Sequence, residues 1–87
     1  TDTARFEQAQ KDVKTLDRKP GNDDLLFLYA HFKQGSAGDV SGKRPGMLDM
    51  VGRAKYDAWA KLTGMSAADA KQKYIHKVDS LLKSHKG

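Results

Sequence analysis

The sequence predicts an all-α protein: one domain that forms a four-helix bundle with a long crossover between helices two and three. Apolar residues recur at helical spacing in four segments of the chain. No segment shows the strict alternation of apolar and polar residues beside a tight turn that is expected of strands. The length of 87 residues is that of one domain. We therefore expect residues 1–87 to form a single domain with a modest core.

The first helix is predicted around an apolar stripe whose members are three or four residues apart. We expect the helix to stop at Pro20-Gly21, because proline and glycine both interrupt helices. Three members of the stripe, Phe6, Val13 and Leu16, should lie in the interior. The full stripe consists of Phe6, Ala9, Val13 and Leu16.

The second helix is predicted to begin at Asn22, because asparagine is a good N-terminal cap. Asp23 and Asp24 follow and place negative charge at the positive end of the helix dipole. Leu28 should lie in the interior. The apolar face of this helix consists of Leu25, Leu28, Tyr29 and Phe32.

The third helix is predicted around a shorter stripe, with Gly64 beyond it as a C-terminal stop. We expect Ala58 and Leu62 to lie in the interior. The stripe consists of Val51, Ala54, Ala58 and Leu62.

The last helix is predicted to follow Ser66, which with Asp69 resembles a capping box in which aspartate replaces glutamate. We expect Val78 to lie in the interior. The apolar face consists of Ala70, Tyr74, Val78, Leu81 and Leu82.

The connection between the second and third helices, from Gln34 to Asp49, is the longest in the chain and is rich in glycine. It exceeds the usual turn between bundle helices. It can span the length of the bundle, so helices two and three need not be antiparallel neighbours. Because it carries Met47 and Leu48, we expect part of it to pack against the helices.

The composition favours a cytoplasmic protein with an anionic partner. There is no cysteine, so disulfides are excluded, and the longest apolar run, residues 25–30, is far too short to span a membrane. The chain does not open on a secretory signal pattern. The formal net charge of +5 suits nucleic acid, an anionic membrane surface or a phosphorylated small molecule, and charge alone does not choose among them.

Several kinds of chemistry find no support in the sequence. Residues 38–44 superficially resemble a phosphate-binding loop, but Ala37 stands where the first glycine should be, and Arg44 stands where serine or threonine should hold magnesium. The histidines His31, His76 and His85 have no metal-binding spacing, and we expect each at the surface. No nucleophile and base are suggested. We therefore expect no enzyme activity, no cofactor and no metal.

Tyr29 and Lys33 are spaced to lie side by side on one helix face. A phenol and an ammonium there can give a phosphate one neutral and one charge-assisted hydrogen bond. Phe32 adds an aromatic surface that suits a purine base. The alternative is that both aromatic residues belong to the core and that Lys33 is solvated at its boundary.

Lys55 and Lys14 also flank apolar faces, Lys55 on the third helix and Lys14 on the first. Together with Lys33, they place lysines on three helices that could converge on one anion. Each lysine taken alone is more often a residue whose stem covers apolar surface while its head stays in water.

The chain resembles the acyl-CoA-binding protein family over essentially its whole length. The stretch from Pro20 to Gly38 is similar to the family signature, whose centre is matched by residues 29–34, Tyr-Ala-His-Phe-Lys-Gln. Residues 44–49, Arg-Pro-Gly-Met-Leu-Asp, and residues 55–59, Lys-Tyr-Asp-Ala-Trp, match two further blocks. The resemblance implies an up-down-down-up bundle.

The resemblance also implies a ligand site. Tyr29, Lys33 and Lys55 would hold the ribose 3′-phosphate of CoA, and Leu25 and Ala54 would edge a groove for the fatty chain. The further CoA contacts implied are Lys14, Phe32 and Tyr74.

Some residues depart from the family pattern. Gly35 replaces the usual alanine, and Phe32 lacks the hydroxyl of relatives that carry tyrosine. Val51 stands where many members have lysine, so one expected cationic contact is absent. Val51 could line the lip of the groove or could point into the bundle as core.

We therefore interpret the chain as a monomeric carrier that binds medium- and long-chain fatty acyl-CoA esters and forms an intracellular pool of them. Its expected partners are acyl-CoA, acyl-CoA-using enzymes and, transiently, a membrane surface, with no nucleic acid and no metal. The alternative from another class is a basic helical module that binds nucleic acid. It predicts arginine and asparagine clustered on one helix, whereas arginine is sparse here.

Overall fold

The structure is a computed structural model, and it describes residues 2–16 and 19–86 of the chain. Its described residues form helices and no strand, so the predicted all-α fold is confirmed. A 3₁₀ turn, η1, extends the first helix. The elements are α1 (Asp2–Asp12), η1 (Val13–Thr15), α2 (Asn22–Ala37), α3 (Met50–Ala60) and α4 (Ala67–Lys86).

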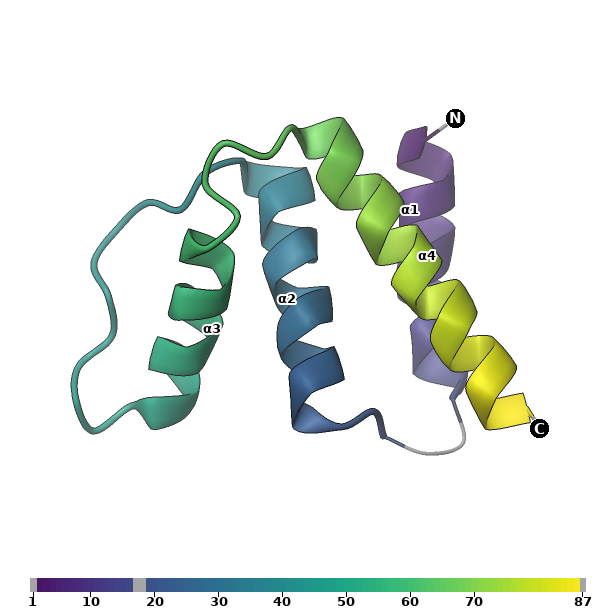
Figure 1. Cartoon of the computed structure of the whole chain (residues 1–87), viewed down its shortest axis with the longest axis horizontal. Helices are drawn as coiled ribbons and strands as arrows, with labels where there is room; N and C mark the ends of the chain where they lie inside the picture. Colours follow the sequence, from purple (N-terminus) through teal and green to yellow (C-terminus); the bar gives the residue numbers. More distant parts are fainter. Residues whose placement is uncertain (1, 17–18, 87) are drawn as a thin grey trace.

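The helices follow the up-down-down-up course expected of the bundle. In Figure 1, α2 and α3 lie side by side and run in the same direction, whereas α1 and α4 both run the opposite way. α2 packs against α4 on one side and α3 on the other, and α1 packs against α4. The crossover leaves the end of α2 and returns along the outside of α3 to the start of that helix (Figure 1).

The core lies where α1, α2 and α4 meet. Phe6, Leu28 and Val78 are buried there, as predicted. The Phe6 ring stacks on Phe32 at 6.0 Å between centroids and meets the edge of Tyr74 at 5.1 Å, in the geometries that aromatic pairs prefer. The buried cluster consists of Phe6, Ala9, Leu28, Tyr74, Val78 and Leu81, with Val13, Leu16, Phe32, Ile75 and Leu82 packed against it.

Four residues expected in the interior are only partly buried. Val13 and Leu16 pack against the edge of the core, and the other two belong to the third stripe. Ala58 and Leu62 are only partly buried, because, among the described helices, α3 packs against α2 and against no other. The buried residue of α3 is Trp59. Helical spacing therefore identified the inner face of α3 but overestimated how deeply that face is covered.

Two helix boundaries differ from the expectation. The cap of α2 is Gly21, whose carbonyl accepts a hydrogen bond from the Leu25 amide, and Asn22 is already helical. α2 also continues to Ala37, so the crossover spans residues 38–49 and begins at Gly38, which has a φ of 84°. A positive φ strains residues that carry a Cβ, which explains why the helix leaves off at a glycine.

The two ends of the turn between α3 and α4 follow the predicted chemistry. Gly64 adopts a φ of 93° beyond the end of α3. The Ser66 hydroxyl accepts a hydrogen bond of 3.0 Å from the amide of Asp69, which is half of the predicted capping box.

The crossover is held by polar side chains and not by Met47 and Leu48. These two residues are 79% and 102% exposed, so the expectation that they pack was wrong. Instead, four side chains of α3 reach back to the loop. Trp59 Nε1 donates to Gly38 O (2.8 Å), the Tyr56 hydroxyl to Gly42 O (2.9 Å) and Arg53 Nε to Pro45 O (2.9 Å), and Asp57 accepts two hydrogen bonds from Arg44 (2.9 and 2.7 Å).

Candidate functional site

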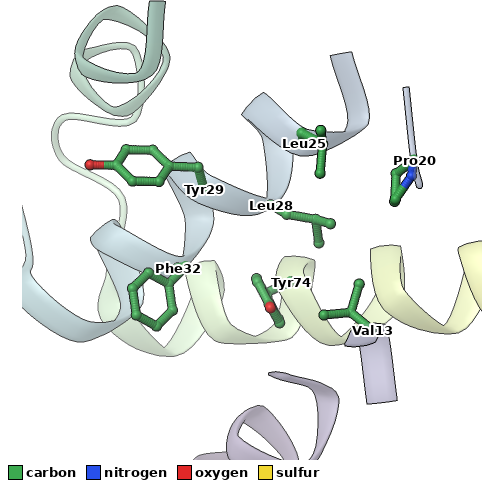
Figure 2. A pocket seen from close by; sticks show the side chains of 7 residues that line it. All are labelled: Val13, Pro20, Leu25, Leu28, Tyr29, Phe32 and Tyr74. Carbon is green, nitrogen blue, oxygen red and sulfur yellow. The ribbon is translucent and has the colours of Figure 1, made fainter. Parts of the chain in front are cut away.

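An apolar cavity of about 270 Å³ opens between η1, α2 and α4. Figure 2 shows the side chains around it, with Phe32 at one end, Val13 and Pro20 at the other, and Tyr74 between them. In that view the Tyr29 hydroxyl points away from the other six side chains. The lining residues are Val13, Pro20, Leu25, Leu28, Tyr29, Phe32 and Tyr74.

A second, larger groove of about 490 Å³ lies between the start of α2 and the start of α3. Leu25 lines both cavities, so the two share a wall. Val51 is 68% exposed and lines this groove, which rules out its alternative position in the core. The lining residues are Lys19, Asn22, Leu25, Leu26, Met50, Val51, Ala54 and Lys55.

The two predicted phosphate lysines lie in the α2–α3 interface, each over an aromatic ring of the other helix. Lys55 Nζ on α3 is 5.3 Å from the centre of the Tyr29 ring on α2. Lys33 Nζ on α2 is 4.9 Å from the centre of the Trp59 ring on α3. Tyr29 and Lys33 are four residues apart, as are Lys55 and Trp59, so the two contacts lie one helical turn apart along two parallel helices.

Both ammonium groups are available to an anion. The described ion pairs are Arg44 with Asp57 and Lys77 with Asp24, so within residues 2–16 and 19–84 neither Lys33 nor Lys55 is paired with a carboxylate. Lys33 is half-buried and Lys55 is exposed. A cation held over a ring face keeps its charge, and a phosphate offers it a stronger, charge-assisted hydrogen bond.

Tyr74 and Lys14 occupy different surroundings. Tyr74 is buried, and burial raises the pKa of its phenol above the ordinary value, so the group stays neutral and can donate a hydrogen bond. Lys14 is exposed on η1 next to Val13. Within residues 2–16 and 19–84, no hydrogen bond, ion pair or ring contact joins Lys14 to the other predicted site residues.

Sequence reasoning missed Trp59 as the platform beneath Lys33. Trp59 lies four residues after Lys55, and this spacing predicts only that Lys55 flanks the apolar face of its helix. Lys19 and Asn22 at the mouth of the larger groove carry no periodic signal. Met50 begins α3 and lies at the edge of the apolar stripe. At that position, the sequence pattern does not distinguish a residue that lines a groove from one that is simply exposed.

One histidine was misplaced by the sequence interpretation. His31 is 5% exposed, its ring stacks on Phe27 at 4.0 Å between centroids, and its Nδ1 is 2.8 Å from the Phe27 carbonyl oxygen. Burial lowers the pKa of His31, against the opposing effect of that hydrogen bond. His76 is exposed as expected, and the His85 side chain lies outside the described part. In the described residues, no three His, Cys, Asp or Glu side chains gather as a metal site would require.

The comparison with known proteins decides the family. Residues 3–78 match the family model described as "Acyl CoA binding protein". The chain belongs to the acyl-CoA-binding protein family. It is 52% identical over 81 residues to an acyl-CoA-binding protein homolog of Manduca sexta, covering 92% of this chain and 90% of the relative. It is 45% identical over 80 residues to acyl-CoA-binding protein homolog 1 of Caenorhabditis elegans, covering 92% and 93%.

Solved structures of acyl-CoA-binding proteins share the fold. The crystal structure of Oryza sativa acyl-CoA-binding protein 2 matches with a TM-score of 0.94 at 36% identity, covering 99% of this chain and 94% of that one. The crystal structure of the protein from Moniliophthora perniciosa matches with a TM-score of 0.90 at 39% identity, covering 98% and 84%. The family and the bundle predicted from the sequence are therefore confirmed, and membership supports acyl-CoA as the ligand.

Proposed function

We propose that this member of the acyl-CoA-binding protein family binds medium- and long-chain fatty acyl-CoA esters tightly and carries them in the cytoplasm without transforming them. One observation carries the proposal. Two lysines with no carboxylate partner among the described residues, Lys33 and Lys55, lie over aromatic rings beside an apolar groove. An anionic head with an apolar tail is the ligand that matches both features.

The head group carries about four negative charges near neutral pH, on its 3′-phosphate and diphosphate. In our proposal, Lys33, Lys55 and the Tyr29 hydroxyl hold the 3′-phosphate between α2 and α3. Phe32 and Tyr74 line the neighbouring cavity and give the adenine an aromatic surface. Lys14, which is exposed on η1, adds a cation at the rim.

The tail lies in the larger groove, which Leu25 and Ala54 help to line. Each methylene that leaves water contributes up to ~0.8 kcal/mol. Ten methylenes would contribute roughly 8 kcal/mol before the cost of ordering the chain. Affinity should therefore rise with chain length, while the head group determines specificity and pose.

A carrier needs no catalytic group, because sequestration changes no bond. By holding acyl-CoA out of solution, the protein would form an intracellular pool that enzymes draw on, as a monomer that touches those enzymes and membrane surfaces only briefly. The described part of the chain contains no helix that is long and apolar enough to cross a membrane. No cofactor takes part in this proposal, and acyl-CoA is the cargo.

A nucleic-acid-binding module is not favoured. Arginines that read base edges must be free to reach a groove of the nucleic acid. Here Arg44 is bound to Asp57 and Arg53 to the Pro45 carbonyl, and both contacts hold the crossover.

Calorimetric titration with palmitoyl-CoA, palmitate and free CoA tests the proposal. We expect tight binding of palmitoyl-CoA and far weaker binding of either half alone, since each half forfeits one of the two matched surfaces. A series of acyl-CoA esters should bind more tightly as the chain lengthens. Equal affinity for palmitate and palmitoyl-CoA would refute the head-group site, and no binding of palmitoyl-CoA would refute the function.

A further inference from the structure

The crossover presents two large apolar side chains at the outermost point of a turn. The Asp49 amide donates a hydrogen bond of 3.0 Å to Gly46 O, which closes a turn with Met47 and Leu48 at its centre. Central turn positions usually carry glycine, proline, asparagine or aspartate. Leu48 is 102% exposed, so its side chain touches almost nothing of the protein. We call Met47 and Leu48 the apolar tip.

The apolar tip belongs to an anchored loop. Arg53 holds Pro45 immediately before the turn, and the Asp49 carboxylate caps α3 immediately after it by accepting a hydrogen bond of 2.9 Å from the Gly52 amide. Arg44 is held by both oxygens of Asp57. Because both ends of the turn are tied to α3, the exposure of the tip is built into the fold.

The proposed ligand does not account for the apolar tip. Met50 and Val51 are also exposed, at 78% and 68%, but they line the larger groove, where an acyl chain would cover them. Met47 and Leu48 line neither cavity. Only Asp49 separates the tip from Met50 and Val51 in the sequence, so four exposed apolar side chains lie within residues 47–51, and we call them the apolar strip.

The charge around the strip is positive. Lys43, Lys19 and Lys55 are exposed beside the loop or at the groove. Of the nearby acidic side chains, Asp49 and Asp57 are occupied by the helix cap and by Arg44, and Asp23 is exposed in the first turn of α2. Two copies of a chain with net charge +5 repel each other, whereas an anionic leaflet attracts basic residues and accepts apolar side chains.

We propose that the apolar tip inserts into the interface of an anionic lipid bilayer and brings the mouth of the groove to the membrane surface. Lys43 and Lys19 then face the lipid phosphates. Two side chains are a small anchor, so attachment is weak and reversible. Its purpose, passage of an acyl chain between bilayer and groove, rests on the proposed function, but attachment itself requires no acyl-CoA.

Flotation with vesicles free of acyl-CoA tests the attachment. Vesicles of phosphatidylcholine alone are compared with vesicles that also contain phosphatidylserine. We expect the protein to bind the anionic vesicles. The affinity for these vesicles should fall about tenfold or more in the double variant Met47→Ser, Leu48→Ser. It should fall about fivefold in Lys43→Gln. The matched control is Lys83→Gln on α4, because the end of that helix lies across the molecule from the crossover (Figure 1). The affinity of Lys83→Gln for the anionic vesicles should fall least of the three variants.

Insertion can be observed directly because the chain has no cysteine. A polarity-sensitive fluorophore on Leu48→Cys should shift to shorter wavelength with anionic vesicles, and the same fluorophore on Lys83→Cys should not. Equal shifts at both positions would contradict insertion at the tip.

Two further outcomes overturn the proposal. If the double Met47/Leu48 variant binds vesicles as well as the wild type, attachment is electrostatic and the tip plays no part. If the wild type instead self-associates in sedimentation and the double variant does not, the tip is an interface between copies. Palmitoyl-CoA titration of the same variant separates membrane attachment from the proposed acyl-CoA binding. We expect the variant to keep its affinity for acyl-CoA while losing its affinity for vesicles.

Discussion

The two sides of α2 meet their neighbours in different ways. On the side facing α1 and α4, Leu28 joins a continuous apolar cluster that contains Phe6 and Val78. On the side facing α3, the contacts are cations over rings and an open groove, and α3 is itself tied to the crossover by hydrogen bonds from its polar side chains. The first side supplies most of the apolar burial, and the second leaves cations and apolar surface free for a ligand.

The buried glutamine Gln34 joins the two sides at one end. Its Nε2 donates to Asp39 Oδ1 in the crossover and to the Met65 carbonyl before α4, both at 2.8 Å. The Asp39 carboxylate also accepts from the Gly64 amide, and these bonds hold the pKa of Asp39 below its ordinary value. The Gln34 Oε1 atom is buried and has no hydrogen-bond partner among the described residues, so only the amide nitrogen of this side chain is satisfied. The hydrogen bonds of Nε2 tie the crossover and the turn before α4 to the core without filling the groove.

The largest expected effect comes from truncating a leucine on the core side of α2. Leu28→Ala should lower the free energy of unfolding by roughly 2–5 kcal/mol, the range for buried leucines. Leu26→Ala, a matched change on the half-buried side that lines the larger groove, should cost less than half as much. Urea unfolding of both variants measures the difference. Equal losses would mean that α3 contributes as much apolar packing as α1 and α4.

Next in size are the lysines of the α2–α3 interface. Lys33→Ala or Lys55→Ala should weaken palmitoyl-CoA binding by roughly 1–3 kcal/mol, as expected for hydrogen bonds to charged groups. The thermal midpoint should change little, because each variant loses one cation–π contact, about 0.5–1 kcal/mol at an exposed site, and no ion pair among the described residues. Lys73→Ala, an exposed lysine on α4, is the control for overall charge.

The same titration with a ligand that lacks the 3′-phosphate sharpens this prediction. The losses caused by Lys33→Ala and Lys55→Ala should shrink sharply, because their target is gone. Undiminished losses would show that the lysines support the fold or bind another part of CoA.

A smaller effect is expected from protonation of His31. Its pKa is lowered mainly by burial, so the unfolded chain takes up protons below about pH 6.5 that the folded chain resists. Stability therefore falls as the pH drops through that value. We expect the thermal midpoint to decline more steeply between about pH 7.5 and about pH 5.5 in the wild type than in His31→Gln. Exposed His76→Gln should keep the wild-type slope, and an unchanged slope in His31→Gln would contradict the assignment.

The core could be predicted from sequence because helical spacing reports which face of a helix is apolar. Phe6, Leu28 and Val78 followed from that rule. The same rule overestimated the burial of Ala58, since spacing does not say how many neighbours cover a face. The expectation that Met47 and Leu48 pack was made from their apolar character alone, which does not say whether a loop residue has any neighbours. A residue's apolar character is compatible both with the core and with a membrane or ligand contact.

The residues of the candidate site were predicted from family resemblance, but their geometry was not. The crossed arrangement of Lys33 over Trp59 and Lys55 over Tyr29 depends on the register of α2 against α3. That register is set by the crossover and by Gln34, through contacts between residues distant in sequence. The spacing within each helix is visible in the sequence, whereas the alignment of the two helices is not.

The smallest expected effect concerns Val51, which stands where many family members carry lysine. It lies in the first turn of α3, one turn before Lys55, at the lip of the larger groove. Val51→Lys should strengthen palmitoyl-CoA binding by only about 0–1 kcal/mol, the range for exposed ion pairs. The gain should fade as salt rises, because exposed charges are screened over about 8–10 Å at physiological ionic strength.

The same substitution removes a branched apolar contact from the lip, so it should also flatten the dependence of affinity on acyl chain length. Val51→Gln is the matched control, because it removes the apolar surface without adding charge. It should flatten the chain-length series equally and show no gain at low salt. Since Val51 is 68% exposed, neither variant should shift the thermal midpoint appreciably. A large gain that persists at high salt would show that a buried phosphate contact, and not the tail, dominates binding at this lip.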